Sequence, residues 1–158
     1  MQQIFPGVLG LLSPFHQAEG PLTQASLGFF HQILDQARDI ICVVQADGKI
    51  LYANQAAIKA YGYTIDELLQ MTVLDLRAIE TKHLVTDQLK TALSAGSLFR
   101  TQHRRKNGEV FPVEVSAKKL ELGGVEAGVS IIRDITDIVA VDQVLIDNEQ
   151  KQQALNEE

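Results

Sequence analysis

The chain has 158 residues, of which 46% are hydrophobic and 22% are charged, proportions typical of one globular domain with short appendages. Its net charge of −6 argues against a nucleic-acid-binding surface, because such surfaces carry an excess of basic residues. The only basic cluster, Arg104-Arg105-Lys106 next to His103, is interpreted as a solvated strand end before a turn. Cys42 is the one cysteine, so no internal disulfide can form, and we predict a cytoplasmic location.

Residues 1–22 contain three of the four prolines and are expected to be irregular. Their apolar stretch, residues 4–15, is too short to span a bilayer, which takes about 20 residues, and it lacks the basic start of a secretory signal. We predict an arm that covers an apolar surface on this subunit or on a partner, with no membrane contact.

A helix is predicted over residues 23–38, started by Thr23 as the N-cap, with an apolar stripe formed by Leu27, Phe30, Leu34 and Ala37. The β-rich runs 40–45 and 49–53 follow on either side of Asp47-Gly48. Because Asp-Gly tolerates the positive φ angles of a tight turn, these runs predict a hairpin.

Short helices are predicted over residues 54–96. One covers 55–61 and ends at Gly62, and a second begins at a capping box formed by Thr64 and Glu67. A turn is expected near 73–76. A longer helix over 80–94 is predicted to end at Gly96, with an inner face made of Leu84, Gln88 or Leu89, and Leu93.

Three further strands are predicted after this helix. Residues 98–106 pair with 110–122 across Asn107-Gly108, and Gly123-Gly124 leads into a last strand over 125–133. Apolar and polar residues alternate from Phe111 to Lys118, so one face of that strand is expected to be buried. The predicted fold class is α+β: a five-stranded antiparallel sheet covered on one face by short helices, with N-terminal and C-terminal flanking helices.

The chain resembles a PAS (Per-Arnt-Sim) sensor domain over residues 39–137, in the order of strand, Asp-Gly, strand, "YANQAA", "YGYTIDELL", helix, "RRKNGEVFPVEVS", strand and "RDIT". Asn54 matches the family's Asn after the second strand, and Asp134, Ile135 and Thr136 match its Asp-Ile-Thr. The resemblance implies an input domain in which these three residues transfer a signal to the following helix. It also implies a place in two-component or cyclic-dinucleotide signalling.

Residues 138–158 are predicted to form a signalling helix of the coiled-coil type. Asp134 can cap its start, and Asp137 adds negative charge to the first turn. A heptad seam recurs at spacings of three and four: Ile138, Val141, Leu145, Asn148, Gln152 and Leu155. The prediction is a helix paired with a second copy, and the alternative is a lone amphipathic helix folded back on its own sheet.

The residues present no catalytic constellation. Cys42 lies in the middle of a strand and is interpreted as a core residue. Four histidines, at positions 16, 31, 83 and 103, are too dispersed for a metal site, and no Gly-rich loop before a helix is present to hold a phosphate. We therefore predict neither an enzyme nor a metal site.

The resemblance raises the question of haem or flavin, and we expect neither. Haem-binding relatives place a His on the long helix before the third strand, but His83 lies in its first turn and is expected to point outward. Photoactive flavin relatives need a cysteine in the segment that here reads "LLQMTVLDLRAIE", and redox flavin relatives often stack a tryptophan, which this chain lacks.

An apolar ligand pocket is predicted instead, lined by Val43, Ile58, Tyr61, Leu74, Leu89, Phe99, Val115 and Ile131. Tyr61 and Tyr63 can supply a polar tip in such a wall, although ordinary core or rim positions are the simpler interpretation. A small organic acid reached by Arg77 or Arg100 is one hypothesis for the ligand, while both arginines are expected on the surface.

The predicted function is a sensory input and dimerisation module that binds a small ligand or a partner and passes the change to its C-terminal helix. Its expected partners are a second copy of the chain, a small molecule, and an effector domain in the same or a partner chain. Two alternatives stay open: a ligand-free dimerisation or protein-interaction module, and a small α+β enzyme with a cavity.

Overall fold

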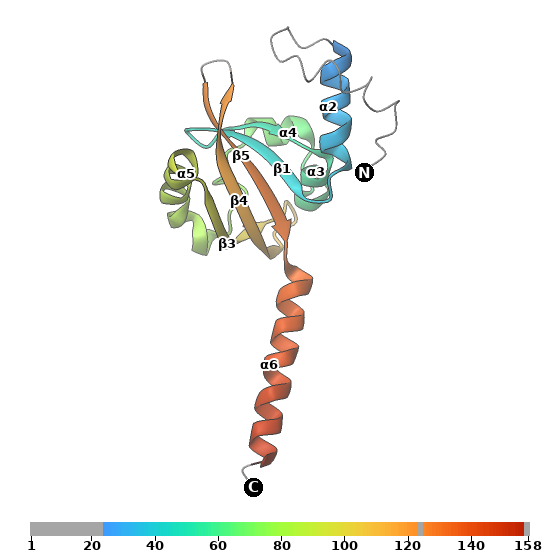
Figure 1. Cartoon of the computed structure of the whole chain (residues 1–158), viewed down its shortest axis with the longest axis vertical. Helices are drawn as coiled ribbons and strands as arrows, with labels where there is room; N and C mark the ends of the chain where they lie inside the picture. Colours follow the sequence, from blue (N-terminus) through green and yellow to red (C-terminus); the bar gives the residue numbers. More distant parts are fainter. Residues whose placement is uncertain (1–23, 123–124, 157–158) are drawn as a thin grey trace, which may run out of the picture. The chain divides into compact units, whose positions relative to one another are not determined.

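A computed structural model of the chain describes residues 24–122 and 125–156, and the predicted arm, residues 1–22, lies outside them together with Thr23 and Gly123-Gly124. The chain divides into two compact units, residues 1–36 and 37–158. In the first unit, helix α2 (Gln24–Gln36) falls within the predicted helix. The second unit holds the sheet, the short helices and the C-terminal helix (Figure 1).

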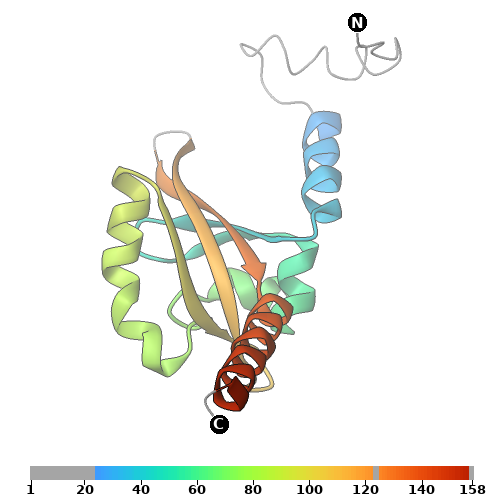
Figure 2. The same ribbon diagram turned by 60° about the horizontal axis from the view of Figure 1, so that its bottom comes forward.

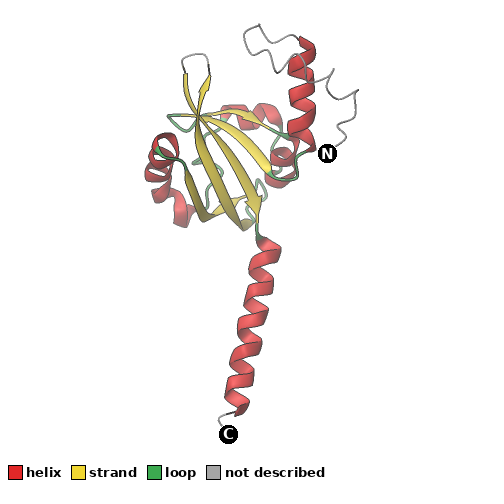
Figure 3. Cartoon of the chain, in the orientation of Figure 1, coloured by secondary structure: helices red, strands yellow, loops and turns green. Residues whose placement is uncertain are grey.

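The described part of the second unit contains one five-stranded antiparallel sheet in the order β2-β1-β5-β4-β3. Its strands are β1 (Ile40–Gln45), β2 (Ile50–Ala53), β3 (Ser97–Arg104), β4 (Val110–Leu122) and β5 (Val125–Asp134). Figure 3 shows them as a single curved sheet. The predicted fold class and strand number are therefore confirmed.

The hairpins predicted at Asp47-Gly48 and Asn107-Gly108 both form, and their loops are built in the same way. Gly48 and Gly108 take φ angles of +93° and +91°, which an L side chain rarely adopts. The residue just before each glycine, Asp47 or Asn107, accepts a hydrogen bond at its side-chain Oδ1 from the backbone N–H two positions later. Each loop thus depends on an Asx side chain followed by a glycine.

Four helical segments join β2 to β3: α3 (Gln55–Tyr61), α4 (Ile65–Gln70), the 3₁₀ helix η1 (Ile79–Leu84) and α5 (Val85–Ser94). Helix α3 ends at Gly62, whose φ is +78°, and α4 starts with both bonds of the predicted capping box between Thr64 and Glu67. Figure 2 shows α5 alongside the sheet, where it contacts β3, β4 and β5.

The predicted helix over 80–94 is wrong for its first five residues, 80–84, and right from residue 85 onward. Residues 79–84 form the 3₁₀ helix η1. The N-cap positions of η1 and α5 are Ala78 and Leu84, and neither has a side-chain capping hydrogen bond. The Thr81 hydroxyl donates to the carbonyl oxygens of Ala78 and Gln102, which ties this turn to β3. Leu84 is consequently exposed, and Val85 takes the buried position that Leu84 was expected to hold.

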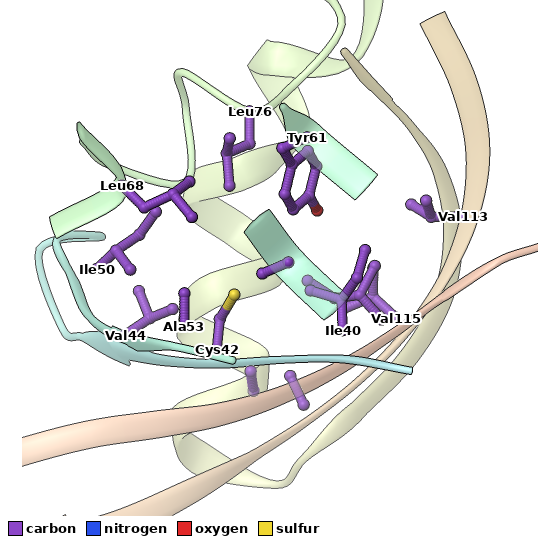
Figure 4. Close-up of a cluster of buried hydrophobic side chains, with 14 of the residues drawn as sticks. Ile40, Cys42, Val44, Ile50, Ala53, Tyr61, Leu68, Leu76, Val113 and Val115 are labelled. Carbon is purple, nitrogen blue, oxygen red and sulfur yellow. The ribbon is translucent and has the colours of Figure 1, made fainter. Parts of the chain in front are cut away.

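Side chains from the sheet and the short helices share one buried cluster, which includes Cys42, Val44, Tyr61, Leu68 and Leu76 (Figure 4). Along β1 and β4, buried and partly exposed residues alternate. The helices therefore cover one face of the sheet, as predicted.

A single residue, Ile135, separates the end of β5 from the start of helix α6 (Thr136–Asn156). Residues 136–155 are all exposed, which does not match the alternative of a helix folded back on its own sheet. Among the described helices, none combines the length and the apolarity that a membrane crossing requires.

Candidate functional site

A cavity of about 50 Å³ lies between the sheet and α5. Its walls come from all five strands, from α5 and from the segment before η1. It is lined by Cys42, Val44, Ile50, Val73, Leu76, Arg77, Val85, Gln88, Leu89, Ala92, Leu93, Phe99, His103, Val115, Ala117, Gly128, Ser130 and Ile132. Most of these side chains are apolar, so the few polar ones define what the cavity can recognise.

Three of the predicted pocket residues, Leu89, Phe99 and Val115, line this cavity. Val43 and Ile131 do not, because the inward positions of their strands belong to Cys42, Val44 and Ile132. The runs "IICVV" and "SII" are apolar on both faces of the sheet, so their sequence does not reveal which alternate residues point inward.

The other three predicted pocket residues also lie outside the cavity lining. Leu74 is 42% exposed in the turn after α4. Ile58, on α3, is half-buried against the core cluster. Tyr61 is fully buried, but its hydroxyl bonds to His103 Nδ1 at 2.7 Å. Tyr63 is a partly buried neighbour of the same core.

Arg77 is a functional candidate that was expected on the surface, yet it is only 5% exposed and lines the cavity. A short bridge pairs Arg77 with His103, so the segment before η1 extends the edge of β3. The Arg77 Nη1 donates to Thr101 Oγ1 at 2.6 Å, and its guanidinium lies 5.5 Å from the Phe99 ring centroid. Burial lowers the pKa of Arg77 to about 10, so it stays charged at neutral pH. Arg100 is exposed as predicted and pairs with Glu114.

His103 belongs to a buried aromatic cluster with Tyr61 and Phe111, whose ring centroids lie 5.8 to 6.3 Å apart. Burial and the nearby Arg77 charge lower the pKa of His103 to about 3, so its imidazole is neutral at physiological pH. His103, next to the cluster Arg104-Arg105-Lys106 that was interpreted as a solvated strand end, is therefore buried. Alternation along β3 is the signal that predicts its burial, since Thr101 is buried as well.

Arg105 also departs from that interpretation, because its guanidinium connects three parts of the domain. It lies 3.7 Å from the Phe111 ring centroid, and it donates to Ala60 O at 2.6 Å and to Asp134 Oδ2 at 2.8 Å. Asp134 Oδ1 accepts from the backbone N–H and the hydroxyl of Thr136 in the first turn of α6. Burial raises the pKa of Asp134, but the bonds from Thr136 and Arg105 outweigh it and the net shift is downward.

Asn54 is completely buried and holds β1 to the start of α3. Its Oδ1 accepts from the backbone N–H groups of Ile41 and Ala57, and its Nδ2 donates to Asp39 O at 3.1 Å. These bonds account for the asparagine at this position, since the side chain caps a helix and pairs with the sheet at once.

The cavity does not fit haem or flavin. Sites for drug-sized ligands enclose roughly 300 to 1,000 Å³, whereas this cavity holds about 50 Å³. His83 is exposed and does not line it. Cys42 does line it, but burial raises the pKa of its thiol to about 12, so it is neither a thiolate ligand nor a nucleophile at neutral pH. Within residues 24–122 and 125–156, no three His, Cys, Asp or Glu side chains gather so as to hold a metal ion.

Comparison with known proteins adds an independent line of inference. The sequence matches the PAS fold over residues 28–135. It is 30% identical over 110 residues to the methyl sulfide methyltransferase-associated sensor of Methanosarcina acetivorans, and 26% identical over 130 residues to the nitrogen fixation regulatory protein of Klebsiella oxytoca. These matches cover 68% and 80% of the chain, but only 11% and 26% of the two relatives.

Solved structures agree on the fold. The PAS domain of the HTR-like protein from Haloarcula marismortui superposes with a TM-score of 0.64 at 25% identity, covering 71% of this chain and 93% of that domain. The matching part is nearly the whole of that domain, so the sheet and its helical cover form the shared unit.

Proposed function

We propose that this chain, which belongs to the PAS family, is the sensory input and dimerisation module of a signal-transduction protein. The coarse role, a sensor domain, agrees with its relatives, which are a sensor and a regulatory protein. The finer proposal has three parts: a small molecule occupies the cavity, β5 carries its effect to α6, and α6 pairs with a second copy. An effector domain in the same or a partner chain, in a two-component or cyclic-dinucleotide system, receives the change.

A continuous path supports the transfer step. Ser130 and Ile132 of β5 line the cavity, and Asp134 follows two residues later as the last residue of β5, just before α6. Arg105 holds Asp134 and the last turn of α3 together through Ala60 O. A shift of β5 or α3 on ligand binding would change these bonds, and with them the first turn of α6. The predicted trio Asp134, Ile135 and Thr136 therefore keeps its proposed role in signal transfer.

The observation that carries the dimer is the exposure of apolar side chains on α6. Four seam residues are exposed by 46 to 73%: Ile138, Val141, Leu145 and Leu155. Pairing through this seam would remove them from water, which is the dominant driving force of helix association. Asn148 and Gln152 complete the seam as polar positions that can set its register.

Sedimentation of two matched variants tests the pairing. Leu145→Asp places a charge in the proposed seam, whereas Ile146→Asp makes the same charge change at the next residue, which is exposed and off the seam. We expect Leu145→Asp to weaken the dimer at least tenfold, about 1.4 kcal/mol, because a carboxylate would be buried without a partner. Ile146→Asp should leave the dimer near wild-type strength. Equal effects of the two variants, or none, would show that the seam is wrongly assigned.

The small cavity favours a second candidate, a dimerisation module without a ligand. In that case the core is simply incompletely filled, and α6 alone carries the function. Native mass spectrometry separates the two, because a ligand-binding module retains or takes up a small molecule and a ligand-free one does not. A cavity enzyme is less well supported, since none of the residues that line the cavity is an Asp or Glu that could act as a base.

A further inference from the structure

Arg77 is a buried cation without a counter-ion in the part of the chain that the structure describes. The ion pairs among the described residues involve Arg100, Arg105, Lys106, Lys119 and Arg133, and not Arg77. The Arg77 Nη1 donates a hydrogen bond to the hydroxyl of Thr101, which is neutral. The buried Nε of Arg77 has no hydrogen-bond partner. An unpaired charge in a protein interior is strongly unfavourable. The arrangement therefore favours an anion from outside the chain.

Gln88, which also lines the cavity, has a second unsatisfied polar atom. Its Oε1 is buried without a hydrogen-bond donor, and it comes from α5, whereas Arg77 comes from the segment before η1. Two lining residues from independent elements thus each have one buried polar atom without a partner. Buried polar atoms are normally paired, so each of these two indicates a missing partner.

The remaining walls limit the size and charge of that partner. Leu76, Val85, Leu89 and Phe99 supply apolar surface, which a hydrocarbon group can cover but an inorganic anion cannot. Arg77 is the one ionised side chain of the lining, because the imidazole of His103 is neutral. A cavity of about 50 Å³ accommodates about three to five water-sized groups. A single negative charge on a very small, partly apolar molecule satisfies all of these conditions.

We propose that the cavity binds a short-chain monocarboxylate of about two or three carbons, with its carboxylate on the Arg77 guanidinium and its hydrocarbon part against the apolar walls. A hydroxyl on that chain donates to Gln88 Oε1. The inference rests on the sensory function proposed above and names the chemical class of its ligand. In this arrangement the ligand lies between α5 and β5, the strand that leads to α6.

Saturation-transfer NMR on the full chain, prepared in buffers free of carboxylates, tests this directly. Propionate and lactate are the probes, 1-propanol is the neutral control, and thermal shifts in equal sodium chloride control for ionic strength. We expect both acids to give methyl signals of the bound state and to raise the unfolding temperature, and 1-propanol and chloride to do neither. Signals of equal strength from 1-propanol, or equal shifts from chloride, would overturn the proposal.

Two variants locate the binding. Arg77→Met keeps the length of the side chain and removes its charge, so propionate binding should fall at least tenfold, while the exposed control Arg100→Gln should bind as the wild type does. The wild type should bind lactate more tightly than propionate, because the lactate hydroxyl donates to Gln88 Oε1. Gln88→Leu should still bind propionate and should lose this preference for lactate. If Arg77→Met does not fold, the Gln88→Leu result decides, and unchanged preference for lactate contradicts the assignment.

The oligomeric state separates failure of this inference from failure of the proposed function. If the wild type is a dimer that Leu145→Asp disrupts while neither acid binds, the ligand class alone is wrong. If the chain stays monomeric, the sensory and dimerisation module is wrong, whatever the cavity binds.

Discussion

Acid is expected to destabilise this domain through His103. The imidazole is 5% exposed, and Tyr61, Phe111 and the Arg77 charge surround it. Its pKa falls from 6.5 to about 3 on folding, through burial first and the Arg77 charge second. Because the folded pKa is below the unfolded one, the unfolded chain binds the extra proton between these values. The stability contributed by neutral His103 is complete above about pH 6.5 and is lost as the pH falls toward about 3.

The magnitude follows from the shift. One group that is protonated only in the unfolded state changes the free energy of unfolding by about 1.4 kcal/mol per pH unit. Between about pH 6.5 and pH 5 the loss should approach 2 kcal/mol, and over the whole window about 5 kcal/mol. Small domains are stable by about 5 to 15 kcal/mol in total, so the effect is measurable well before the carboxylates titrate.

Urea unfolding followed by circular dichroism, at a series of pH values from about 7 to 5, measures this slope. His103→Gln can still hydrogen-bond to the Tyr61 hydroxyl, because its side-chain amide both donates and accepts, but it cannot titrate in this range, so its slope should be nearly flat. His83→Gln removes an exposed histidine and should keep the wild-type slope. A flat wild-type curve, or the same slope in His103→Gln, would refute the reasoning.

Three further predictions concern the residues that hold the domain together. Asn54→Ala should lower the free energy of unfolding by about 2 to 4 kcal/mol in urea titrations, since it leaves buried backbone groups of β1 and α3 unpaired, and a loss below about 0.5 kcal/mol would contradict that role. Arg105→Gln should lower the free energy of unfolding by about 1.5 to 3 kcal/mol and increase amide hydrogen exchange in the first turn of α6. The exposed control Arg100→Gln should lower it by about 0.5 kcal/mol or less. Equal losses would be incompatible with the proposal that Arg105 connects α3 to the start of α6. Cys42 should react with a thiol reagent only as fast as the protein unfolds, because its buried thiol has a pKa raised to about 12, and rapid labelling of the folded protein would disprove its burial.

Local signals predicted the elements of the sheet and its short helices well. The Asp47-Gly48 and Asn107-Gly108 pairs mark both hairpins, and the Thr64 and Glu67 box marks the start of α4, because each depends on neighbours in sequence. The family resemblance predicted how these strands and helices combine into one sheet with a helical cover. Both the family and the fold class are confirmed. The boundary between η1 and α5 was missed because Thr81 is held by Gln102, a residue 21 positions away.

The cavity was less predictable than the fold. Val43 and Ile131 lie in runs that are apolar on both faces of the sheet, residues 40–44 and 131–132, and only the burial pattern of the folded sheet reveals which of these residues point inward. Arg77 was named as a possible contact of an acidic ligand but was expected on the surface, and Gln88 was only an alternative to Leu89 for the inner face of its helix, because no local pattern marks a buried polar residue. Their position depends on the bridge from residue 77 to β3 and on the rotation of α5, both of which are tertiary features.

Native mass spectrometry of the full chain tests the central claim most directly, because one spectrum reports the oligomeric state and any retained small molecule together. We expect a dimer at concentrations where the wild-type domain is folded, a monomer for Leu145→Asp, and added mass when propionate is supplied. A wild-type chain that remains monomeric at every concentration, with its sheet intact, would contradict the proposal that this PAS domain signals through paired α6 helices.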